Sequence, residues 1–442
     1  MTSSYDVAVL GAGPAGLATA AAFVAQGRRV VVLERGDRDV FRVGETLSPE
    51  IGPYLQQLGA WETLSGHLDA CSPFTVSRSA WGTSELEERP SILHPLGSGW
   101  HVDRARFDLA FADWVAERGA AVCFGVGNCV AERAGTGFQV RSRRGVPIAA
   151  SALIDASGRG APATDHLQSS TWRAHDRQVA ILRRFRPRGA VNPGPGIVLE
   201  SVTGGFWYSA PLADESVLAV YVTDSDLLTG LGRGKETRFR SALKDAHHTT
   251  VRLGGYEPVE PPLVFRSDSG CLVPSAGVGW TAVGDAAMAT DPLGGNGVLR
   301  ALESAAALVR GWGQPSEEDA RLRKFSDYLD LRASYYLLET RFVNAPFWAR
   351  RRPTAPDGAP LSWKEVEVQL RPTASLRWAK DAPPSAEAWL PPGALAALKS
   401  GLKGPAPAHR ALALVRDAAA LVDRRLLIGL EWLLAAGVLV EE

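Results

Sequence analysis

The sequence lacks an excess of charge of either sign. Among its 442 residues, Lys plus Arg and Asp plus Glu number 48 each, so the formal net charge is zero. Binding to nucleic acid or to an anionic membrane surface is favoured by a surplus of positive charge. The composition therefore favours neither partner. The length is sufficient for two or three hydrophobic cores.

Cysteine is also scarce, and the spacing of the cysteines matches no redox or metal-binding motif. The chain has four cysteines, which are Cys71, Cys123, Cys129 and Cys271. They form no CxxC pair and no cluster with histidines at the spacing of metal ligands. Free thiols suit a reducing compartment, so we expect a cytoplasmic protein without a metal site.

The chain has no apolar run of the length that a membrane span requires. The stretch from Leu426 to Val440 is apolar except for Glu431, but it is shorter than the ~20 residues of a transmembrane helix. We expect it to form a buried or partner-facing helix. The apolar run near the N-terminus follows Asp6 and belongs to the glycine motif described next, so we expect neither a secretion signal nor a membrane span.

The pattern that organises the chain runs from Tyr5 to Arg35, YDVAVLGAGPAGLATAAAFVAQGRRVVVLER. Valine-rich runs at both ends predict buried parallel strands, and the alanine-rich run between them predicts a helix. In the GxGxxG spacing, Gly11 allows a tight turn, Gly13 lets backbone approach a pyrophosphate, and Gly16 lets the helix pack closely on the strand. Glu34 ends the second strand, where its carboxylate can accept hydrogen bonds from ribose hydroxyls. With the helix N-terminus, these residues predict a dinucleotide site.

A second glycine-rich module lies in TAVGDAAMATDPLGGNGVLRALESAAALV. Its strand ends at Gly284 and Asp285, and the loop glycines Gly294, Gly295 and Gly297 precede a helix of small residues. This module would place another helix N-terminus and a carboxylate against the same ligand. A nicotinamide dinucleotide does not need it, whereas a flavin dinucleotide has a ribityl chain to hold. The sequence therefore predicts FAD.

Three shorter segments lie between the two modules. VGET, at 43–46, follows the second strand, and Glu45 within it is predicted to contact the cofactor. HVDRARFD predicts a helix with Asp103 as its N-cap. Arg104 then lies in the first turn, where the helix dipole disfavours a cation, and this indicates an anionic partner. SALIDASG predicts a buried strand that ends at 155–158, where ligands approach parallel sheets.

These patterns predict an α/β protein. We expect a doubly wound Rossmann-like FAD domain, an inserted and mainly antiparallel β domain that binds substrate, and a C-terminal helical extension. The predicted FAD domain comprises residues 1–70, 101–163 and 264–315. The substrate domain comprises 71–100 and 164–263, and the helical cap comprises 316–442.

Three motifs together resemble those of FAD-dependent monooxygenases with the hydroxybenzoate hydroxylase fold: GAGPAG with Glu34, DASG at 155–158, and GDAAMATDPLGGNG at 284–297. VGET, HVDRARFD and RFVNAPFWARR are similar to the branch that contains the flavin-dependent halogenases. The resemblance covers roughly residues 5–350. It implies FAD, with contacts from Gly11, Gly13, Pro14, Ala15, Gly16, Glu34, Arg35, Glu45, Thr46, Arg104, Asp285, Gly294, Gly295, Asn296 and Gly297.

Two departures separate the chain from the halogenases that it resembles. Halogenases of this branch carry a lysine that directs hypohalous acid, and the matching place here is at or near Thr75. No lysine occurs between Glu45 and Ser170. Their WxWxIP signature is replaced by GFWYSAP at 205–211. Both departures disfavour halogenation, which stays an alternative.

GGFWYSAPL and DPLGGNG are most similar to the flavoprotein monooxygenases of tryptophylquinone cofactor biogenesis. This resemblance implies oxygen transfer from a flavin hydroperoxide to an electron-rich aromatic ring, with a tryptophan side chain in a partner polypeptide as one candidate. No second Rossmann unit is visible for a nicotinamide, so NADPH or NADH would visit the flavin transiently, or free reduced flavin would supply the electrons. A prenyl-type flavin reductase and a non-catalytic flavin-binding chaperone stay open as alternatives.

The sequence also gives candidates for the substrate pocket and for acid–base chemistry. Phe206, Tyr208 and Pro292 are the predicted substrate contacts. An aromatic oxygenation needs a group that exchanges a proton with the ring or its substituent. Glu45, His101 and Asp291 are the candidates for that group.

Overall fold

The computed structural model describes residues 3–38, 41–69, 71–91, 94–143, 147–159, 170–192, 194, 196–312, 318–352, 375–382, 390, 392–407, 410–411, 414–415, 430, 433–434 and 437–441. The chain divides into two compact units. The first comprises Met1–Ser79, Glu87–Glu200 and Trp207–Asp319, and the second comprises Ala80–Leu86, Ser201–Phe206 and Ala320–Glu442. Both the predicted FAD domain and most of the predicted substrate domain fall within the first unit, and the boundary between those two domains stays a prediction.

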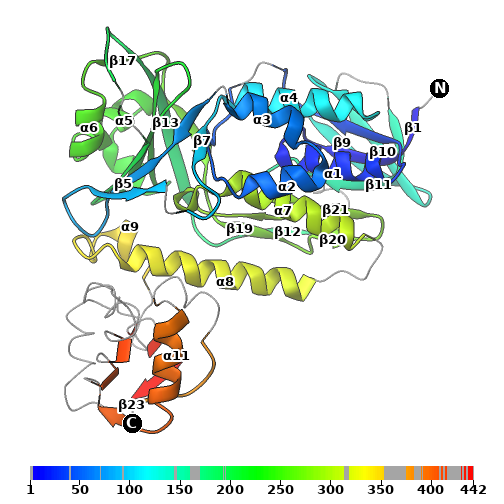
Figure 1. Cartoon of the computed structure of the whole chain (residues 1–442). Helices are drawn as coiled ribbons and strands as arrows, with labels where there is room; N and C mark the ends of the chain where they lie inside the picture. Colours follow the sequence, from blue (N-terminus) through cyan, green and yellow to red (C-terminus); the bar gives the residue numbers. More distant parts are fainter. Residues whose placement is uncertain are drawn as a thin grey trace. The chain divides into compact units, whose positions relative to one another are not determined.

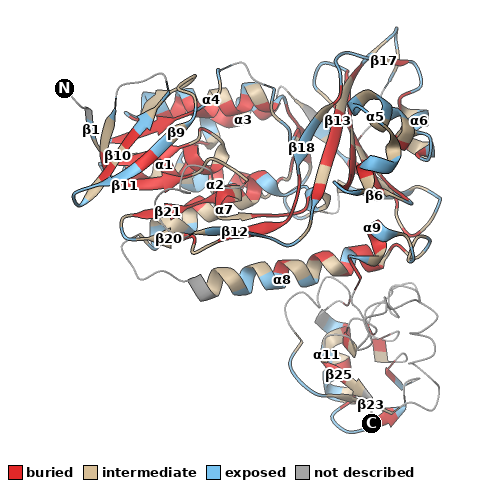
Figure 2. Ribbon diagram, turned by 180° about the vertical axis from the view of Figure 1, so that it is seen from behind, coloured by how far each residue is buried: buried red, intermediate tan, exposed pale blue. Residues whose placement is uncertain are grey.

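A largely parallel sheet is one of the two large sheets of the first unit (Figure 1). Its strand order is β21-β11-β1-β2-β8, with β20 antiparallel to β21 at one edge and the β9–β10 hairpin attached to β11. The bounds are β1 Ser3–Leu10, β2 Val30–Leu33, β8 Ala121–Cys123, β9 Cys129–Ala134, β10 Gly137–Ser142, β11 Ile148–Asp155, β20 Ala276–Gly277 and β21 Trp280–Ala282. Figure 2 shows β11 and β21 as largely buried, as expected for strands that are covered on both faces.

All five parallel strands end at one edge of this sheet. Leu10 lies beside Leu33 and beside Asp155, Leu33 lies beside Cys123, and Asp155 lies beside Ala282. Ligands of parallel sheets bind at this carboxyl edge. The two glycine modules and the DASG turn, which are far apart in the sequence, therefore meet at one place.

Helices cover one face of the parallel sheet. They are α1 Pro14–Ala25, α2 Ile51–Leu58, α3 Trp61–Asp69, α4 Arg104–Glu117 and α7 Gly297–Arg310. Alternate strand residues such as Val7, Val9 and Val32 join their core, whereas Ala8 and Val31 face the opposite side. That side is covered by Phe138 of the β9–β10 hairpin and by other strand residues. Helices thus form one layer and strands the other.

A second large sheet lies mostly in the first unit, in the order β17-β13-β16-β15-β14-β5-β6 with β18 also paired to β13. β13 is antiparallel to β16, β17 and β18, as predicted. The bounds are β5 Val76–Ala80, β6 Glu87–Pro90, β13 Gln178–Pro187, β14 Ile197–Val202, β15 Gly205–Pro211, β16 Val217–Asp224, β17 Tyr256–Pro258 and β18 Leu263–Arg266. Helix α5, Lys235–Leu243, packs on this sheet through Phe239, whose ring lies 5.1 Å from that of Trp207. Helix α6, His247–Arg252, follows it.

Two small sheets lie in the same unit. One has the order β3-β7-β4, with bounds β3 Thr46–Leu47, β4 Ser72–Phe74 and β7 Gly99–His101. The other has the order β12-β19-β22, with bounds β12 Thr171–Ala174, β19 Gly270–Val273 and β22 Met288–Ala289. In the first, Thr46 lies directly opposite His101. This pairing brings two residues of the candidate site together.

The second unit contains helices and a sheet. Its elements are α8 Glu318–Leu337, α9 Pro346–Ala349, α11 Pro392–Gly401 and the antiparallel strands β24 Ala406–Pro407, β23 Ser375–Trp378 and β25 Leu439–Glu441. The expected helical extension is therefore present, but it also carries a sheet of very short strands that sequence patterns did not indicate. The predicted helix from Leu426 to Val440 lies mainly outside the described residues, and its last two residues are in β25. No helix in the described part of the chain combines the length and apolar character needed to cross a membrane.

Candidate active site

The first glycine module is held together by close backbone contacts. Gly11 has a φ of 110°, and a Cβ there would lie 2.4 Å from the carbonyl oxygen of Ala156. A Cβ at Gly16 would lie 2.0 Å from the carbonyl oxygen of Gly11. Neither position has room for a side chain, so these glycines pack the turn, α1 and the DASG segment against one another.

Gly13 differs from its two neighbours, because a Cβ there would meet no atom within 4 Å. It is the N-cap of α1, no side chain caps that N-terminus, and Pro14 occupies the first turn. An uncapped helix N-terminus beside open space is suited to a phosphate. The glycine therefore leaves open space beside the helix N-terminus, while contact with a pyrophosphate stays a prediction for Gly13, Pro14, Ala15 and the neighbouring glycines.

Glu34 lies beside this module. Its carboxylate accepts hydrogen bonds from the N–H groups of Ala12 at 2.7 Å and Gly36 at 3.0 Å, and the residue is 9% exposed. These bonds fix the carboxylate at the end of β2. Contact with a ribose stays a prediction for Glu34, as does cofactor contact for the exposed Arg35.

The second module meets the first directly. A Cβ at Gly284, whose φ is 62°, would lie 2.6 Å from the side chain of Ala15. Asp285 pairs with Arg159 at 3.3 Å, and Arg159 also donates to the carbonyl oxygen of Thr290 at 2.7 Å. The carboxylate predicted to hold the ribityl region thus lies at the carboxyl edge of the parallel sheet, next to a cation.

Open space also surrounds the loop before α7. Gly294, Gly295 and Gly297 are exposed, and a Cβ at each would meet no atom within 4 Å. Asn296, the N-cap of α7, makes no side-chain cap hydrogen bond. This second helix N-terminus is therefore accessible to a flat ligand, while contact with a flavin stays a prediction for these four residues.

Asp291 and Pro292 open the same loop. The Asp291 carboxylate accepts from the N–H of Leu293 at 2.8 Å and from the side-chain amide of Gln178 at 3.0 Å. It therefore caps the short 3-10 helix η4, Pro292–Gly294. These bonds show a role in shaping the loop, and the proposed acid–base role of Asp291 rests on the sequence alone. Pro292 is exposed.

Arg104 has an anionic partner on its own helix. Its guanidinium donates to both carboxylate oxygens of Asp108, at 3.1 and 3.0 Å, and to the carbonyl oxygens of Val43 and Gly44. Asp103 caps this helix as predicted, accepting from the N–H of Arg106 at 3.2 Å. Arg104 therefore anchors the VGET turn, and cofactor contact stays a prediction for it.

Three predicted site residues from three distant segments form a partly buried hydrogen-bonded network, with the buried Glu45 beside it. The Thr46 hydroxyl lies 3.1 Å from Nδ1 of His101 and 2.8 Å from the hydroxyl of Tyr208. The Glu45 carboxylate lies near Tyr208, and its negative charge helps to raise the pKa of the phenol. Glu45 and His101 are 4% and 1% exposed. The structure thus places two of the three acid–base candidates near each other.

The surroundings of His101 and Tyr208 favour the neutral form of each side chain. Burial, assisted by the positive charge of Arg252, lowers the pKa of His101 to about 4. Burial and the neighbouring Glu45 carboxylate raise the pKa of Tyr208 well above its ordinary value. His101 is therefore a neutral imidazole and Tyr208 a neutral phenol at physiological pH.

Phe206 packs within the second unit. Its ring lies 5.6 Å from Trp81, 6.3 Å from Phe347 and 6.5 Å from Tyr336, and the residue is fully buried. These contacts give it a place in an aromatic core, which period-two alternation along a strand cannot distinguish from a substrate pocket. Contact with substrate stays a prediction for Phe206.

Two residues of the site were missed in the sequence. Arg159 directly follows the DASG turn, and that position was the available signal. Arg252 donates to the carbonyl oxygens of Ser209 and Gly196 and acts on His101 and Tyr208 through its charge. It comes from α6, and nothing local in its segment indicates this role.

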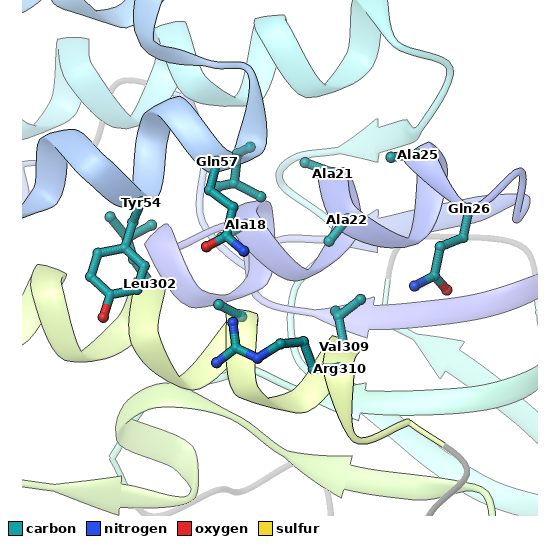
Figure 3. A pocket seen from close by; sticks show the side chains of 12 residues that line it. Ala18, Ala21, Ala22, Ala25, Gln26, Tyr54, Gln57, Leu302, Val309 and Arg310 are labelled. Carbon is teal, nitrogen blue, oxygen red and sulfur yellow. The ribbon is translucent and has the colours of Figure 1, made fainter.

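A cavity of about 270 Å³ lies elsewhere, on the helical layer between α1, α2 and α7. Figure 3 shows it between Ala18 and Ala22 of α1, Tyr54 of α2, and Leu302 and Arg310 of α7. None of the predicted site residues lines it. It is a gap that small alanine side chains leave between helices.

Comparisons with known proteins agree with this geometry. The family model of the NAD(P)-binding Rossmann-like domain matches residues 9–41. LodB of Marinomonas mediterranea, assigned as an FAD-dependent oxidoreductase, is 29% identical over 364 residues, which cover 79% of this chain and 97% of LodB. Further curated relatives named as halogenases share 24% to 27% identity.

Solved structures share the fold. The flavin-dependent halogenase CmlS has a TM-score of 0.70 at 20% identity, and the match covers 100% of this chain and 96% of CmlS. QhpG, a peptidyl tryptophan dihydroxylase essential for tryptophylquinone cofactor biogenesis, has a TM-score of 0.62 at 23% identity, covering 98% of this chain and all of QhpG. The fold is therefore that of the FAD-dependent, halogenase-like flavoproteins, and the relative at 29% identity is assigned as an FAD-dependent oxidoreductase. The predictions of an α/β FAD-binding fold and of an FAD-dependent enzyme are confirmed.

Proposed function

We propose that the chain is an FAD-dependent monooxygenase that hydroxylates an electron-rich aromatic ring, with a tryptophan side chain of a partner polypeptide as the substrate. The observation that carries this proposal is the contact of Gly284 with Ala15, which joins the two glycine modules at the carboxyl edge of the parallel sheet, together with the lack of a side-chain cap on the helix that follows in each module, α1 and α7. An elongated diphosphate ligand with a ring at one end suits this arrangement.

The residues present fit FAD. Gly13 leaves space for the pyrophosphate, Glu34 lies at the end of β2 for the adenosine ribose, and Asp285 lies beside the second module for the ribityl chain. Gly294 and Gly297 leave open space for the flavin ring. Reduced FAD would supply the activation of dioxygen, with NADPH, NADH or free reduced flavin as the source of electrons.

Similarity to two proteins supports the choice of substrate. QhpG is a peptidyl tryptophan dihydroxylase, and the present chain matches its whole length. LodB, the oxidoreductase with 29% identity, is also matched over nearly its whole length.

Halogenation is the second candidate, because several curated relatives are named as halogenases. The absence of any lysine between Glu45 and Ser170 argues against it, since halogenases of the resembled branch carry a lysine there. A prenyl-type reduction and a chaperone role stay as outcomes of the test.

The test is a competition between oxygen and halide. The chain is incubated with FAD, NADPH, ¹⁸O₂, bromide and a set of tryptophan-containing peptides, and the products are analysed by mass spectrometry. We expect peptides that gain oxygen-18 and no bromine. Brominated peptide would show a halogenase, and a product that gains only hydrogen would show a reductase. Peptide that binds unchanged even without FAD would show a chaperone.

Placing a methyl group in the space beside Gly13 is expected to weaken FAD binding by at least about tenfold, which is about 1.4 kcal/mol. The Gly13 backbone is extended, and a Cβ there contacts nothing, so folding stability should change by less than about 0.5 kcal/mol. Gly66→Ala is the matched control, since Gly66 is exposed in α3 with equally open surroundings. A titration with FAD, followed by flavin fluorescence, measures the FAD affinity of the two variants. Equal affinity in the two variants would contradict a pyrophosphate beside Gly13.

A further inference from the structure

Arg159 connects the DASG turn to the second glycine module. It directly follows that turn, and each of the three nitrogens of its guanidinium has a partner in the chain. The two terminal nitrogens donate to backbone carbonyl oxygens, those of Thr290 at 2.7 Å and of Asp268. The Nε atom lies 3.3 Å from the Asp285 carboxylate. Because the guanidinium is planar and rigid, its two backbone contacts fix the direction in which Nε points.

The two carbonyl oxygens that hold Arg159 belong to buried and well-connected residues. Asp268 is 4% exposed, and its carboxylate accepts from the guanidinium of Arg266 at 3.0 and 2.8 Å and from the indole N–H of Trp172 at 3.3 Å. Thr290 is also buried and directly follows β22, which pairs with β19. The position of the Arg159 guanidinium is therefore set by contacts within the protein.

The carboxylate that Arg159 contacts is open to a ligand. The Asp285 side chain is 39% exposed. It lies at the carboxyl edge of the parallel sheet, directly after Gly284, which packs against Ala15 of the first module. A carboxylate offers about four lone-pair positions, so contact with one cation leaves acceptors for hydroxyl groups. An accessible carboxylate at this place suits a ligand with several hydroxyls.

Arg159 also favours the ionised form of Asp285. Partial burial raises the pKa of Asp285, and the positive charges of Arg159, Arg300 and Arg104 oppose that rise. These cations come from the segment after the DASG turn, from α7 and from α4. Removal of the Arg159 charge, which is in contact with the carboxylate, is expected to raise the pKa of Asp285 further. Asp285 would then take up a proton more readily and lose acceptor capacity.

We propose that Arg159 is a positioning residue for the cofactor, which orients the Asp285 carboxylate toward the ribityl hydroxyls of FAD. This inference rests on the FAD site of the proposed function and names the residue on which the geometry of its carboxylate depends. Arg159 acts through Asp285. The competing explanation is an ion pair that only ties chain segments together, which would contribute to folding and leave the FAD affinity of the folded chain unchanged.

The first test compares Arg159→Gln, Asp285→Asn and the double variant in the full chain. FAD affinity is measured at pH 8 by flavin fluorescence, and urea unfolding is measured without FAD. We expect each single variant to bind FAD about tenfold more weakly. The double variant should bind no more weakly than Asp285→Asn, because Arg159 acts through that carboxylate. Two tenfold effects that multiply in the double variant would overturn the proposal, as would an Arg159→Gln affinity equal to that of the unmodified chain.

Arg183→Gln is the matched control. The Arg183 side chain is 11% exposed, pairs with the 41% exposed Glu236 at 2.8 Å, and donates to the carbonyl oxygen of Glu260 at 2.7 Å. It therefore resembles Arg159 in its contacts but lies in β13 of the second large sheet. We expect its FAD affinity to equal that of the unmodified chain. An equal loss in both arginine variants would show a general effect of breaking an ion pair and would overturn the role of Arg159. If glutamine at position 159 prevents folding, Arg159→Lys, which keeps one cationic donor, takes its place in the comparison.

The dependence of FAD affinity on pH is the second test, and a purely structural role would not change it. Without Arg159, Asp285 is protonated at a higher pH. We expect the affinity of Arg159→Gln to fall about threefold more than that of the unmodified chain between pH 8 and pH 5, and this difference to vanish when Asp285 is asparagine. An identical pH dependence in the two proteins would overturn the proposal. An unmodified chain that binds no FAD would overturn the proposed function as well, whereas FAD binding without oxygenated product would overturn only the proposed reaction.

Discussion

Replacing Glu339 by alanine is expected to lower the free energy of unfolding by about 3 to 5 kcal/mol. Glu339 is fully buried in the second unit. Its carboxylate accepts from the N–H of Gly82 at 2.8 Å, from the Ser201 hydroxyl, and from the backbone and guanidinium of Arg341 at 2.7 Å. Alanine would leave the buried Gly82 N–H and Ser201 hydroxyl, and the partly exposed Arg341 guanidinium, without their acceptor.

The ionised form of Glu339 belongs to this network. Burial opposes ionisation, but the hydrogen bonds from Arg341, Ser201 and Gly82 outweigh it and lower the pKa of Glu339. Asp381→Ala is the matched control in the same unit, because Asp381 is 82% exposed and pairs with Lys399 at the surface. We expect it to change stability by less than about 1 kcal/mol. Urea unfolding measured by tryptophan fluorescence compares the two, and equal midpoints would show that Glu339 is not a structural centre of the unit.

Acid is expected to destabilise the chain through His101 by about 3 kcal/mol between pH 7 and pH 4, since each unit of pKa shift corresponds to about 1.36 kcal/mol. The pKa of His101 is lowered to about 4 by burial and by the charge of Arg252, from 6.5 in the unfolded chain. Between these values the unfolded state binds a proton that the folded state does not. Stability therefore falls as pH decreases through this range and levels off below about pH 4.

His101→Gln isolates this contribution, because glutamine keeps a polar side chain that does not titrate. Other groups titrate in the same range, so the measured quantity is the difference in unfolding free energy between wild type and variant at each pH. The groups near the ring, Glu45, Tyr208 and Arg252, are common to both proteins. A difference that stays constant from pH 7 to pH 4 would mean that His101 titrates alike in both states.

The glycine modules could be predicted from the sequence because each is local. Strand, turn and helix N-terminus lie within about thirty residues, and the strand register then brings the modules together at one sheet edge. The pairing of Arg104 with Asp108 was also within reach of sequence reasoning, since residues four apart face each other on a helix.

The hydrogen bonds of Thr46 with His101 and Tyr208 could not be predicted in the same way. Glu45 and Thr46, His101 and Tyr208 come from three segments, and only the pairing of β3 with β7 and the placement of β15 bring them together. Their residue types identified them as candidate site residues but did not indicate which of them lie in contact. Phe206 shows the reverse problem, because an aromatic residue on a buried strand has the same pattern in a core as in a pocket.

The most direct test of the central claim is the visible absorption spectrum of the purified full-length chain after FAD is added and the free flavin is removed. The account predicts a yellow protein with about one FAD per chain, because two glycine modules, each followed by a helix without a side-chain cap, meet at one sheet edge. A colourless protein that retains no FAD would contradict it, and the open space at Gly13 and at Gly294–Gly297 would then have to belong to a different ligand.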